Sequence, residues 1–247
     1  MKVIRLLICL YIVVCCISCK STIKEQTDKV YSRHLQRYVD LTIITTAKPD
    51  KKEDMNLLLF TDSKYLETTR AKGIIDSLYK KKKIQPMLLV AMRGQQGDYG
   101  LEESDKTKAK QFKKYNEFVI NELYAFVKKK TVIRKFNSVA ICGFGASAIS
   151  SFDIAWNNDE KIGMAGMFDP TFVKASNDSS ILQTLQGLRK RPNLKIWLAA
   201  SSSDTSALLF KNMMDNRKSI TECSLTTSNE ARQDANFAAF ILWAFPK

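Results

Sequence analysis

Short apolar segments and longer helix-like segments alternate along this chain, and their order restricts the fold more than any single motif does. The strand-like apolar runs cover residues 41–46, 56–61, 87–92, 138–142, 163–168, 194–200 and 223–226. The segments interpreted as helices cover residues 73–82, 110–130, 146–156 and 235–245. Repeated strand-helix-strand order predicts an α/β fold, with a mostly parallel central sheet and helices on both faces.

The first residues of the chain are typical of a secretion signal. Lys2 and Arg5 precede an apolar run at residues 6–17, which is too short to span a bilayer comfortably. The run leads to Cys19 through a segment that resembles the lipobox of bacterial lipoproteins, with Cys16 where leucine is usual. We expect cleavage before Cys19 and attachment of palmitate-type acyl chains to it. The alternative is a plain secretory signal in which Cys19 has no role.

Three segments follow from this interpretation. We expect a signal peptide at residues 1–18, an N-terminal tether at 19–40 and one domain at 41–247, since the chain is long enough for one substantial core. The mature protein would be anchored by its lipid in the bacterial cell envelope, facing the periplasm or the surface. The alternative is a soluble secreted or periplasmic protein. Cys142 and Cys223, the cysteines left in the domain, are predicted as small core residues and not as a disulfide or metal pair.

The chain is strongly basic. Its formal charge of +14 falls to +12 when Lys2 and Arg5 leave with the signal peptide. Lysines gather at residues 80–83, 106–114 and 128–130. Two interpretations are open: these lysines lie on solvated helix ends and faces, or they form a surface that attracts an anionic membrane, polysaccharide or nucleic acid. We favour the solvated faces, and no nucleic acid is expected because basic and aromatic residues do not interleave.

One turn carries a family resemblance. The pentapeptide 143–147 reads Gly-Phe-Gly-Ala-Ser between the run at 138–142 and a helix, and it resembles the G-x-S-x-G nucleophile elbow of esterase D-type esterases, which are similar to enterochelin and feruloyl esterases. The segments Asp98-Tyr99-Gly100, 194–197 and 240–245 resemble other parts of the same family. The matching segments cover about residues 56–245. The resemblance implies an α/β-hydrolase fold.

The resemblance also implies a degenerate catalytic triad. Gly145 occupies the position of the nucleophilic serine, and Ser228 falls where the family has its histidine. Asp204 occupies the position of the acid, although a loop aspartate that caps a helix or a turn is the interpretation we favour. Ala146 would supply the oxyanion-like backbone N–H. The chain has one histidine, His34, which lies in the expected tether and is interpreted as a surface residue.

Other chemistry finds little support in the sequence. Ser147, Ser150 and Ser151 follow the turn but have no positioned base, and Asp169-Pro170 is interpreted as a turn. One histidine and scattered carboxylates give no zinc-ligand spacing, and no phosphate-binding glycine-rich loop occurs, so neither a metal nor a cofactor is expected.

Two functions are consistent with these residues. The first is a catalytically degenerate, esterase-like lipoprotein that binds or scaffolds in the envelope, with an envelope protein or a small-molecule or glycan ligand in the remnant pocket. Its membrane contact would be the lipid anchor. The alternative is a carboxylic-ester hydrolase that uses unconventional residues. We favour the first, so the chain is expected not to be an enzyme.

Overall fold

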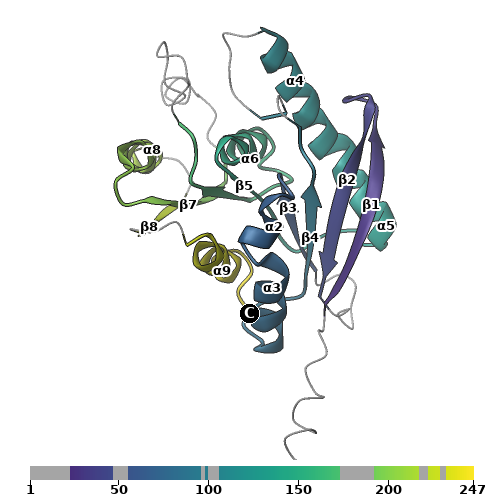
Figure 1. The fold of residues 1–247 in the computed structure, drawn as a ribbon, viewed down its shortest axis with the longest axis horizontal. Helices are drawn as coiled ribbons and strands as arrows, with labels where there is room; N and C mark the ends of the chain where they lie inside the picture. Colours follow the sequence, from purple (N-terminus) through teal and green to yellow (C-terminus); the bar gives the residue numbers. More distant parts are fainter. Residues whose placement is uncertain are drawn as a thin grey trace, which may run out of the picture.

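The structure is a computed structural model that describes residues 23–46, 55–95, 98–99, 106–172, 192–216, 222–228 and 232–247, with the side chains of 106–109 and 228 left out. Its centre is an eight-stranded sheet in the order β1-β2-β4-β3-β5-β6-β7-β8 (Figure 1). The strands are β1 (Lys24–Ser32), β2 (Arg37–Thr45), β3 (Asn56–Phe60), β4 (Met87–Met92), β5 (Val139–Phe144), β6 (Met164–Phe168), β7 (Lys195–Ser201) and β8 (Glu222–Ser228). From β4 to β8 every neighbouring pair is parallel, whereas β2 is antiparallel to both β1 and β4.

Helices cover both faces of the sheet (Figure 1). They are α2 (Tyr65–Thr68), α3 (Ala71–Lys80), α4 (Lys106–Glu117), the π-helix η1 (Phe118–Leu123), α5 (Tyr124–Thr131), α6 (Ala146–Asn157), α8 (Thr205–Asp215) and α9 (Gln233–Ala244). Side chains of α2, α3 and α9 pack in one apolar cluster, and those of α4, η1, α5, α6 and α8 pack in the other. This arrangement confirms the predicted α/β-hydrolase fold.

The central strands are apolar on both sides because both sides are covered. All residues of β3, β4 and β5 are buried, as the uninterrupted apolar runs at these positions predict. Cys142 on β5 and Cys223 on β8 are buried, free thiols, so the prediction that they are core residues is confirmed. Burial raises the pKa of both thiols.

The N-terminal segment differs from the expectation. We expected a tether at residues 19–40, but from Lys24 onwards this stretch pairs with the sheet as β1 and the first half of β2. Most side chains of β1 point to solvent, and only Val30 and Ser32 are buried in it. A strand at the edge of a sheet therefore has a polar sequence, which is why it resembles a tail.

Two further points of comparison with the sequence concern α8 and the signal segment. The helix α8 was not predicted, since the sequence indicated only a loop around Asp204. The signal segment and Cys19 lie outside the described residues. Within the part of the chain that the structure describes, no helix combines the length and the apolar character needed to cross a bilayer.

The packing of β6 against α9 generates a prediction. A Cβ atom added to Gly166 would lie 2.8 Å from the ring of Phe240 and 2.9 Å from the Cβ of Cys142. We expect Gly166→Ala to lower the free energy of unfolding by about 1 to 3 kcal/mol through overpacking. Urea denaturation followed by circular dichroism measures this change.

Gly163 provides the control in the same segment, because a Cβ added there meets no atom of the described residues within 4 Å. Gly163→Ala should leave the urea midpoint unchanged or raise it slightly. Equal losses in the two variants would contradict the close contact between β6 and α9.

Candidate functional site

The turn between β5 and α6 has the backbone of a nucleophile elbow. Gly145 stands between the two elements with φ 58° and ψ −122°, a conformation that residues with a side chain rarely adopt. Its N–H donates to the carbonyl oxygen of Phe168 at 2.9 Å, and its own carbonyl oxygen accepts from the N–H groups of Ala148 at 3.2 Å and Thr171 at 3.3 Å. The end of β6 and the residues after it therefore hold the turn.

Glycine is required at the first position of the turn. A Cβ on Gly143 would lie 2.4 Å from the carbonyl oxygen of Ser147 and 2.4 Å from the Oγ1 of Thr61. The Thr61 hydroxyl donates to the carbonyl oxygen of Cys142 at 3.0 Å. Because β3 and the start of α6 both approach the backbone here, no side chain fits.

Position 145 itself is not crowded. Among the described residues, a Cβ added to Gly145 meets only the Oγ1 of Thr171, at 3.6 Å, an ordinary van der Waals contact. The position that holds the nucleophile in the resembled family thus has room for a side chain. What it lacks is the hydroxyl.

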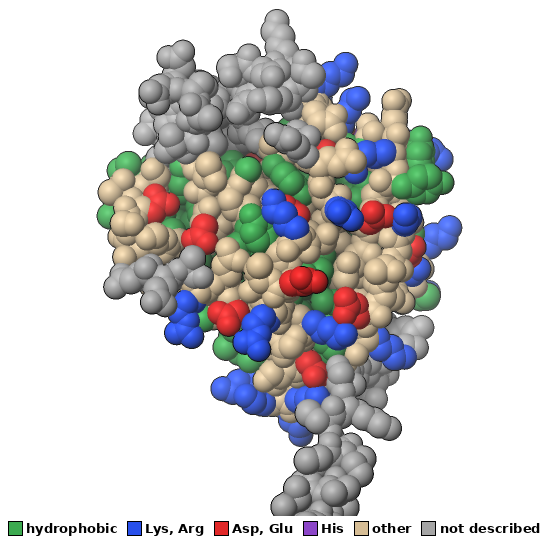
Figure 2. All heavy atoms as spheres, viewed as in Figure 1, with side chains coloured by type: hydrophobic (Ala, Val, Ile, Leu, Met, Phe, Trp, Pro, Cys, Tyr) green, Lys and Arg blue, Asp and Glu red, His purple; other side chains and the backbone are tan. Residues whose placement is uncertain are grey.

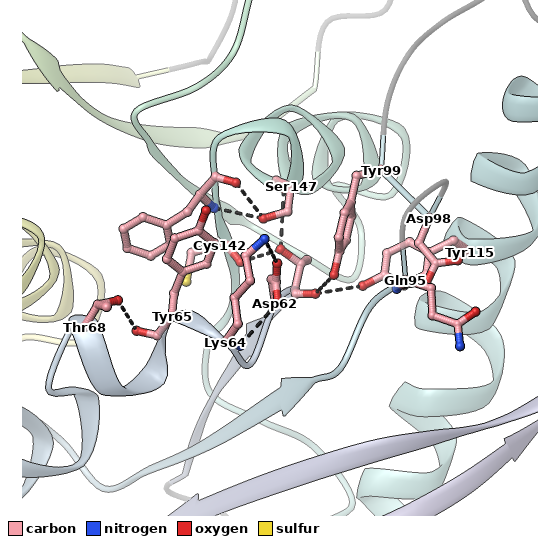
Figure 3. A network of polar contacts seen from close by, with 12 residues as sticks. Asp62, Lys64, Tyr65, Thr68, Gln95, Asp98, Tyr99, Tyr115, Cys142 and Ser147 are labelled. Carbon is pink, nitrogen blue, oxygen red and sulfur yellow. Dashed lines mark hydrogen bonds and ion pairs between the residues drawn. The ribbon is translucent and has the colours of Figure 1, made fainter.

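The serines of α6 have structural hydrogen bonds. The Ser147 hydroxyl accepts from the Phe144 N–H and donates to the Phe144 carbonyl oxygen, both at 2.9 Å, and so closes the turn (Figure 3). The Ser151 hydroxyl donates to the carbonyl oxygen of Ser147 at 2.8 Å, and that of Ser150 donates to the carbonyl oxygen of Ala146 at 3.4 Å. All three serines are buried. Their hydroxyls support the helix and the turn.

The loop after β3 brings a carboxylate beside the turn. Asp62 is only 5% exposed, and its carboxylate accepts from the backbone N–H of Lys64 at 3.2 Å and pairs with the Lys64 ammonium at 2.9 Å (Figure 3). The hydrogen bond to Asp62 raises the pKa of Lys64. The ring of Tyr65, the next residue, stacks on that of Phe144 with centroids 4.6 Å apart. Sequence reasoning missed Asp62, although it directly follows the carboxyl end of a parallel strand, where sites in such sheets usually form.

A second buried carboxylate fixes the loop after β4. Asp98, 1% exposed, forms an ion pair with Arg37 of β2 and accepts from the Gln95 N–H at 2.8 Å and the Gln111 amide at 3.1 Å. Because the charge of Asp98 is matched and hydrogen-bonded, its burial is tolerated. Arg37 was expected in the tether, so its role was missed.

Two tyrosines join this loop to the end of β3. The hydroxyl groups of Tyr99 and Tyr115 donate to the carbonyl oxygen of Thr61, at 2.7 and 3.2 Å (Figure 3). Burial, the largest cause, raises the pKa of both phenols, so both remain donors at neutral pH. Gly94 makes room for this arrangement, since a Cβ there would overlap the Tyr99 hydroxyl at 1.5 Å. The Asp-Tyr pair of the resembled family thus has a structural role here.

The other expected site residues lie at the same edge of the sheet. Ser228 ends β8 and pairs with Ser201 of β7. Ala146 is the first residue of α6, so its N–H has no hydrogen-bond partner within the helix. Like other N–H groups of a first turn, it points outward at the helix N-terminus. His34 lies in the turn between β1 and β2, and β4 and β3 stand between that hairpin and β5.

Asp204 caps a helix. Its carboxylate accepts from the N–H groups of Ser206 at 2.9 Å and Ala207 at 3.2 Å, at the N-terminus of α8. This is the capping interaction that we favoured over a catalytic one. Asp169 follows β6 with φ 43° and donates its N–H to the Ala199 carbonyl oxygen at 2.8 Å. Burial, and after it the nearby charge of Asp204, raises the pKa of Asp169.

The described side chains do not form a metal site. Among the residues with described side chains, no group of three or more His, Cys, Asp or Glu residues is placed to hold a metal ion. Within the described residues, the carboxyl edge of the sheet presents a backbone turn, backbone N–H groups, Asp169, and the bonded or paired carboxylates of Asp62, Asp98 and Asp204.

Comparisons with known proteins place this geometry in a family. A family model described as "Putative esterase" matches residues 40–239. A solved ferulic acid esterase superposes with a TM-score of 0.71 and 12% identity, over 92% of this chain and 99% of that one. The ferric enterobactin esterase from Salmonella typhimurium has a TM-score of 0.68 and 14% identity, over 89% of this chain but only 58% of its own.

An IroE-like serine hydrolase from Shewanella oneidensis also has a TM-score of 0.68, with 13% identity over 90% of this chain and 80% of that one. No protein of curated function matches the sequence. At such low identities these structures share the fold alone. The family model is the stronger finding, because it covers most of the 247 residues and includes the turn at Gly145. The chain belongs to the "Putative esterase" family, as its resemblance to esterase D-type esterases predicted.

Proposed function

We propose that this protein is a non-catalytic member of its family, a lipoprotein of the bacterial envelope that binds a ligand or partner instead of hydrolysing an ester. The observation that carries the proposal is the glycine at position 145, in a turn whose backbone matches that of an elbow. A serine esterase needs a hydroxyl at this point to attack the ester carbonyl. Gly145 has no side chain.

The missing base supports the same proposal. A serine becomes a nucleophile when a histidine within hydrogen-bond reach accepts its proton. The one histidine of the chain, His34, lies in the β1–β2 turn on the far side of β3 and β4. Since Asp204 bonds the N-terminus of α8, its carboxylate is engaged in capping.

The parts that remain favour binding. The Ala146 N–H points out of the first turn of α6, where it can donate to a carbonyl or carboxylate oxygen of a ligand. Tyr65, which is partly exposed, stacks on the buried ring of Phe144, and that ring stacks on the buried ring of Phe168, with centroids 4.6 Å apart at both steps. These groups favour a small carbonyl-bearing molecule whose aromatic or apolar part contacts Tyr65. The names of two similar structures, a ferulic acid esterase and an enterobactin esterase, suggest aromatic esters as probes.

Ester turnover is the experiment that tests the proposal. Purified mature protein should cleave p-nitrophenyl acetate and methyl ferulate no faster than buffer does, because nucleophile and base are both missing. Spectrophotometric assays with each ester measure this. Asp204→Asn, which keeps a capping oxygen, is the matched variant: turnover by the wild type that this variant loses would favour the alternative, an esterase using unconventional residues.

Substitutions at position 145 generate a second prediction. Gly145→Ser and Gly145→Ala should both fold, since the added Cβ has ordinary contacts. Both should lose about 1 to 3 kcal/mol of unfolding free energy, because a side chain is strained at this positive φ. Urea denaturation measures the loss. Neither variant should gain esterase activity, and substantial turnover by Gly145→Ser alone would show that a base is present after all.

Asp204 generates a third prediction. Asp204→Ala removes the cap of α8 and should cost about 1 kcal/mol of unfolding free energy, whereas Asp204→Asn should cost a few tenths at most. Both substitutions should lower the pKa of Asp169, which the charge of Asp204 helps to raise. Thermal denaturation and NMR titration of the Asp169 carboxyl measure the two effects. An unchanged stability in Asp204→Ala would rule out the capping role.

A further inference from the structure

Basic side chains gather at the amino edge of the sheet, where the parallel strands begin. The described connections there run from α3 to β4, from α5 to β5 and from α6 to β6, and the chain ends beside them. We name as the basic edge the lysines and arginines that these connections and the C-terminus carry: Lys81, Lys82, Lys83, Arg134, Lys135, Lys161 and Lys247. The same described stretches contain two acidic side chains, Asp159 and Glu160. Figure 2 shows Lys and Arg side chains at this lower end of the molecule, below α3 and around the C-terminus.

The basic edge is one continuous surface. Pro246 forms a bridge with Ile84, and the Lys247 N–H donates to the carbonyl oxygen of Lys83 at 3.2 Å, which joins the C-terminus to the α3–β4 connection. A groove of about 650 Å³ continues from Pro246 to Lys135 and Lys161, and the acidic residues Asp159 and Glu160 line it as well. The three connections and the C-terminus therefore meet around one groove.

The charges of the basic edge are available to a partner. Among the described residues, none of these seven side chains takes part in an ion pair, unlike Lys80 and Lys195 nearby, which pair with Asp76 and Glu222. All seven are exposed except Lys161, which is partly exposed. Unpaired surface charge of one sign attracts an anionic surface over about a Debye length.

The opposite edge has a different charge. The described connections at the carboxyl ends of the strands carry four acidic residues and four basic ones, so their side-chain charges balance: Asp62, Asp98, Asp169, Asp204, Arg33, Lys64, Arg93 and Arg232. An anionic surface would therefore be attracted more strongly to the amino edge than to these connections, although lysines of α4 also lie near the carboxyl edge. Helix C-termini account for some lysines near the amino edge, but Arg134, Lys135, Lys161 and Lys247 follow no helix directly.

The described chain also begins at this edge. Lys24 pairs with Thr45, and the next residue, Thr46, donates its N–H to the carbonyl oxygen of Met87 at the start of β4, at 3.1 Å. Cys19 precedes Ile23 by four residues, which span at most about 14 Å when extended. A lipid on Cys19 would thus hold the amino edge close to the membrane.

We propose that the basic edge docks on the anionic headgroups of the membrane that holds the lipid anchor, so that the Gly145 turn faces away from that membrane. The inference rests on the proposed lipidation of Cys19 for the nearness of the membrane, and on the described charges for the orientation. The acyl chains expected on Cys19 would supply the attachment, and the basic edge would add the electrostatic attraction that determines which side of the protein faces the headgroups. An acidic polysaccharide would offer the same charge, but the short link from Cys19 to Ile23 would place lipid headgroups at this edge.

Binding to vesicles tests the docking without the lipid. The protein to be used is the mature chain, residues 19–247 with Cys19→Ser, which contains every described strand and helix. It is sedimented with phosphatidylcholine vesicles that either contain or lack phosphatidylglycerol. We expect binding only to the anionic vesicles and a steep loss of binding with added salt. The triple variant Lys81→Gln, Lys83→Gln, Lys135→Gln should bind about a hundredfold more weakly, since each lysine at such a surface contributes about fivefold.

The control is a triple variant of equal net charge. This control carries Lys110→Gln, Lys113→Gln and Lys114→Gln. The three positions lie on α4, close to Gln111, which bonds Asp98 at the carboxyl edge. This variant should bind anionic vesicles within a few fold of the unchanged chain. Equal losses in the two triple variants, equal binding to neutral vesicles, or a preference for dextran sulfate over vesicles at equal anionic charge would each overturn the proposal.

The lipid is tested separately, so that the two failures can be distinguished. Mass spectrometry of the protein extracted from cell membranes should show an acylated Cys19 at the new N-terminus. If the unacylated chain docks on anionic vesicles but Cys19 of the extracted protein is unmodified, the docking role of the basic edge stands and the proposed lipid anchor is wrong. If Cys19 is acylated but the chain shows no charge-dependent docking, the docking role of the basic edge is wrong.

Discussion

The site depends on a constraint of the backbone: at the end of β5 the chain must turn sharply into α6 under the close approach of β3. Gly143 has no room for a side chain, because the Thr61 hydroxyl and the Ser147 carbonyl both crowd it. The next residues are then held by hydrogen bonds from Gly145 to Phe168 and from Thr171 to Gly145. None of these bonds uses the side chain of residue 145. The turn can therefore persist when the nucleophile is replaced by glycine, which also relaxes the strain of a positive φ.

The side chains around the turn mostly have structural roles. Ser147 closes the turn through Phe144, and Tyr99 and Tyr115 both bond the carbonyl oxygen of Thr61. Asp98 is paired with Arg37, and Asp204 caps α8. A catalytic serine and histidine add reactivity to such a framework but are not needed to build it. This explains how a chain can belong to an esterase family while the family's chemistry is in question, and why we propose binding as its function.

Most of the fold could be predicted from the sequence, because buried parallel strands are apolar throughout and helices carry periodic apolar faces. β3, β4 and β5 are examples. The edge strand β1 was missed because only one of its faces packs, and α8 was missed because its start was interpreted as a loop. In the site, the Gly145 turn followed from its short motif. The pairing of Arg37 with Asp98 joins residues 61 positions apart and has no local signal, and the same holds for the contact between Thr171 and the turn.

The central claim is that the elbow has kept its backbone without a nucleophile. Intact-mass spectrometry after incubation with a saturating fluorophosphonate measures this most directly, because the reagent adds covalently to an activated serine whatever ester the enzyme prefers. The mature protein should keep its mass, since Gly145 offers no hydroxyl and the described serines of α6 are buried and hydrogen-bonded. A stoichiometric adduct on a serine next to the turn, lost on unfolding the protein before labelling, would contradict the account.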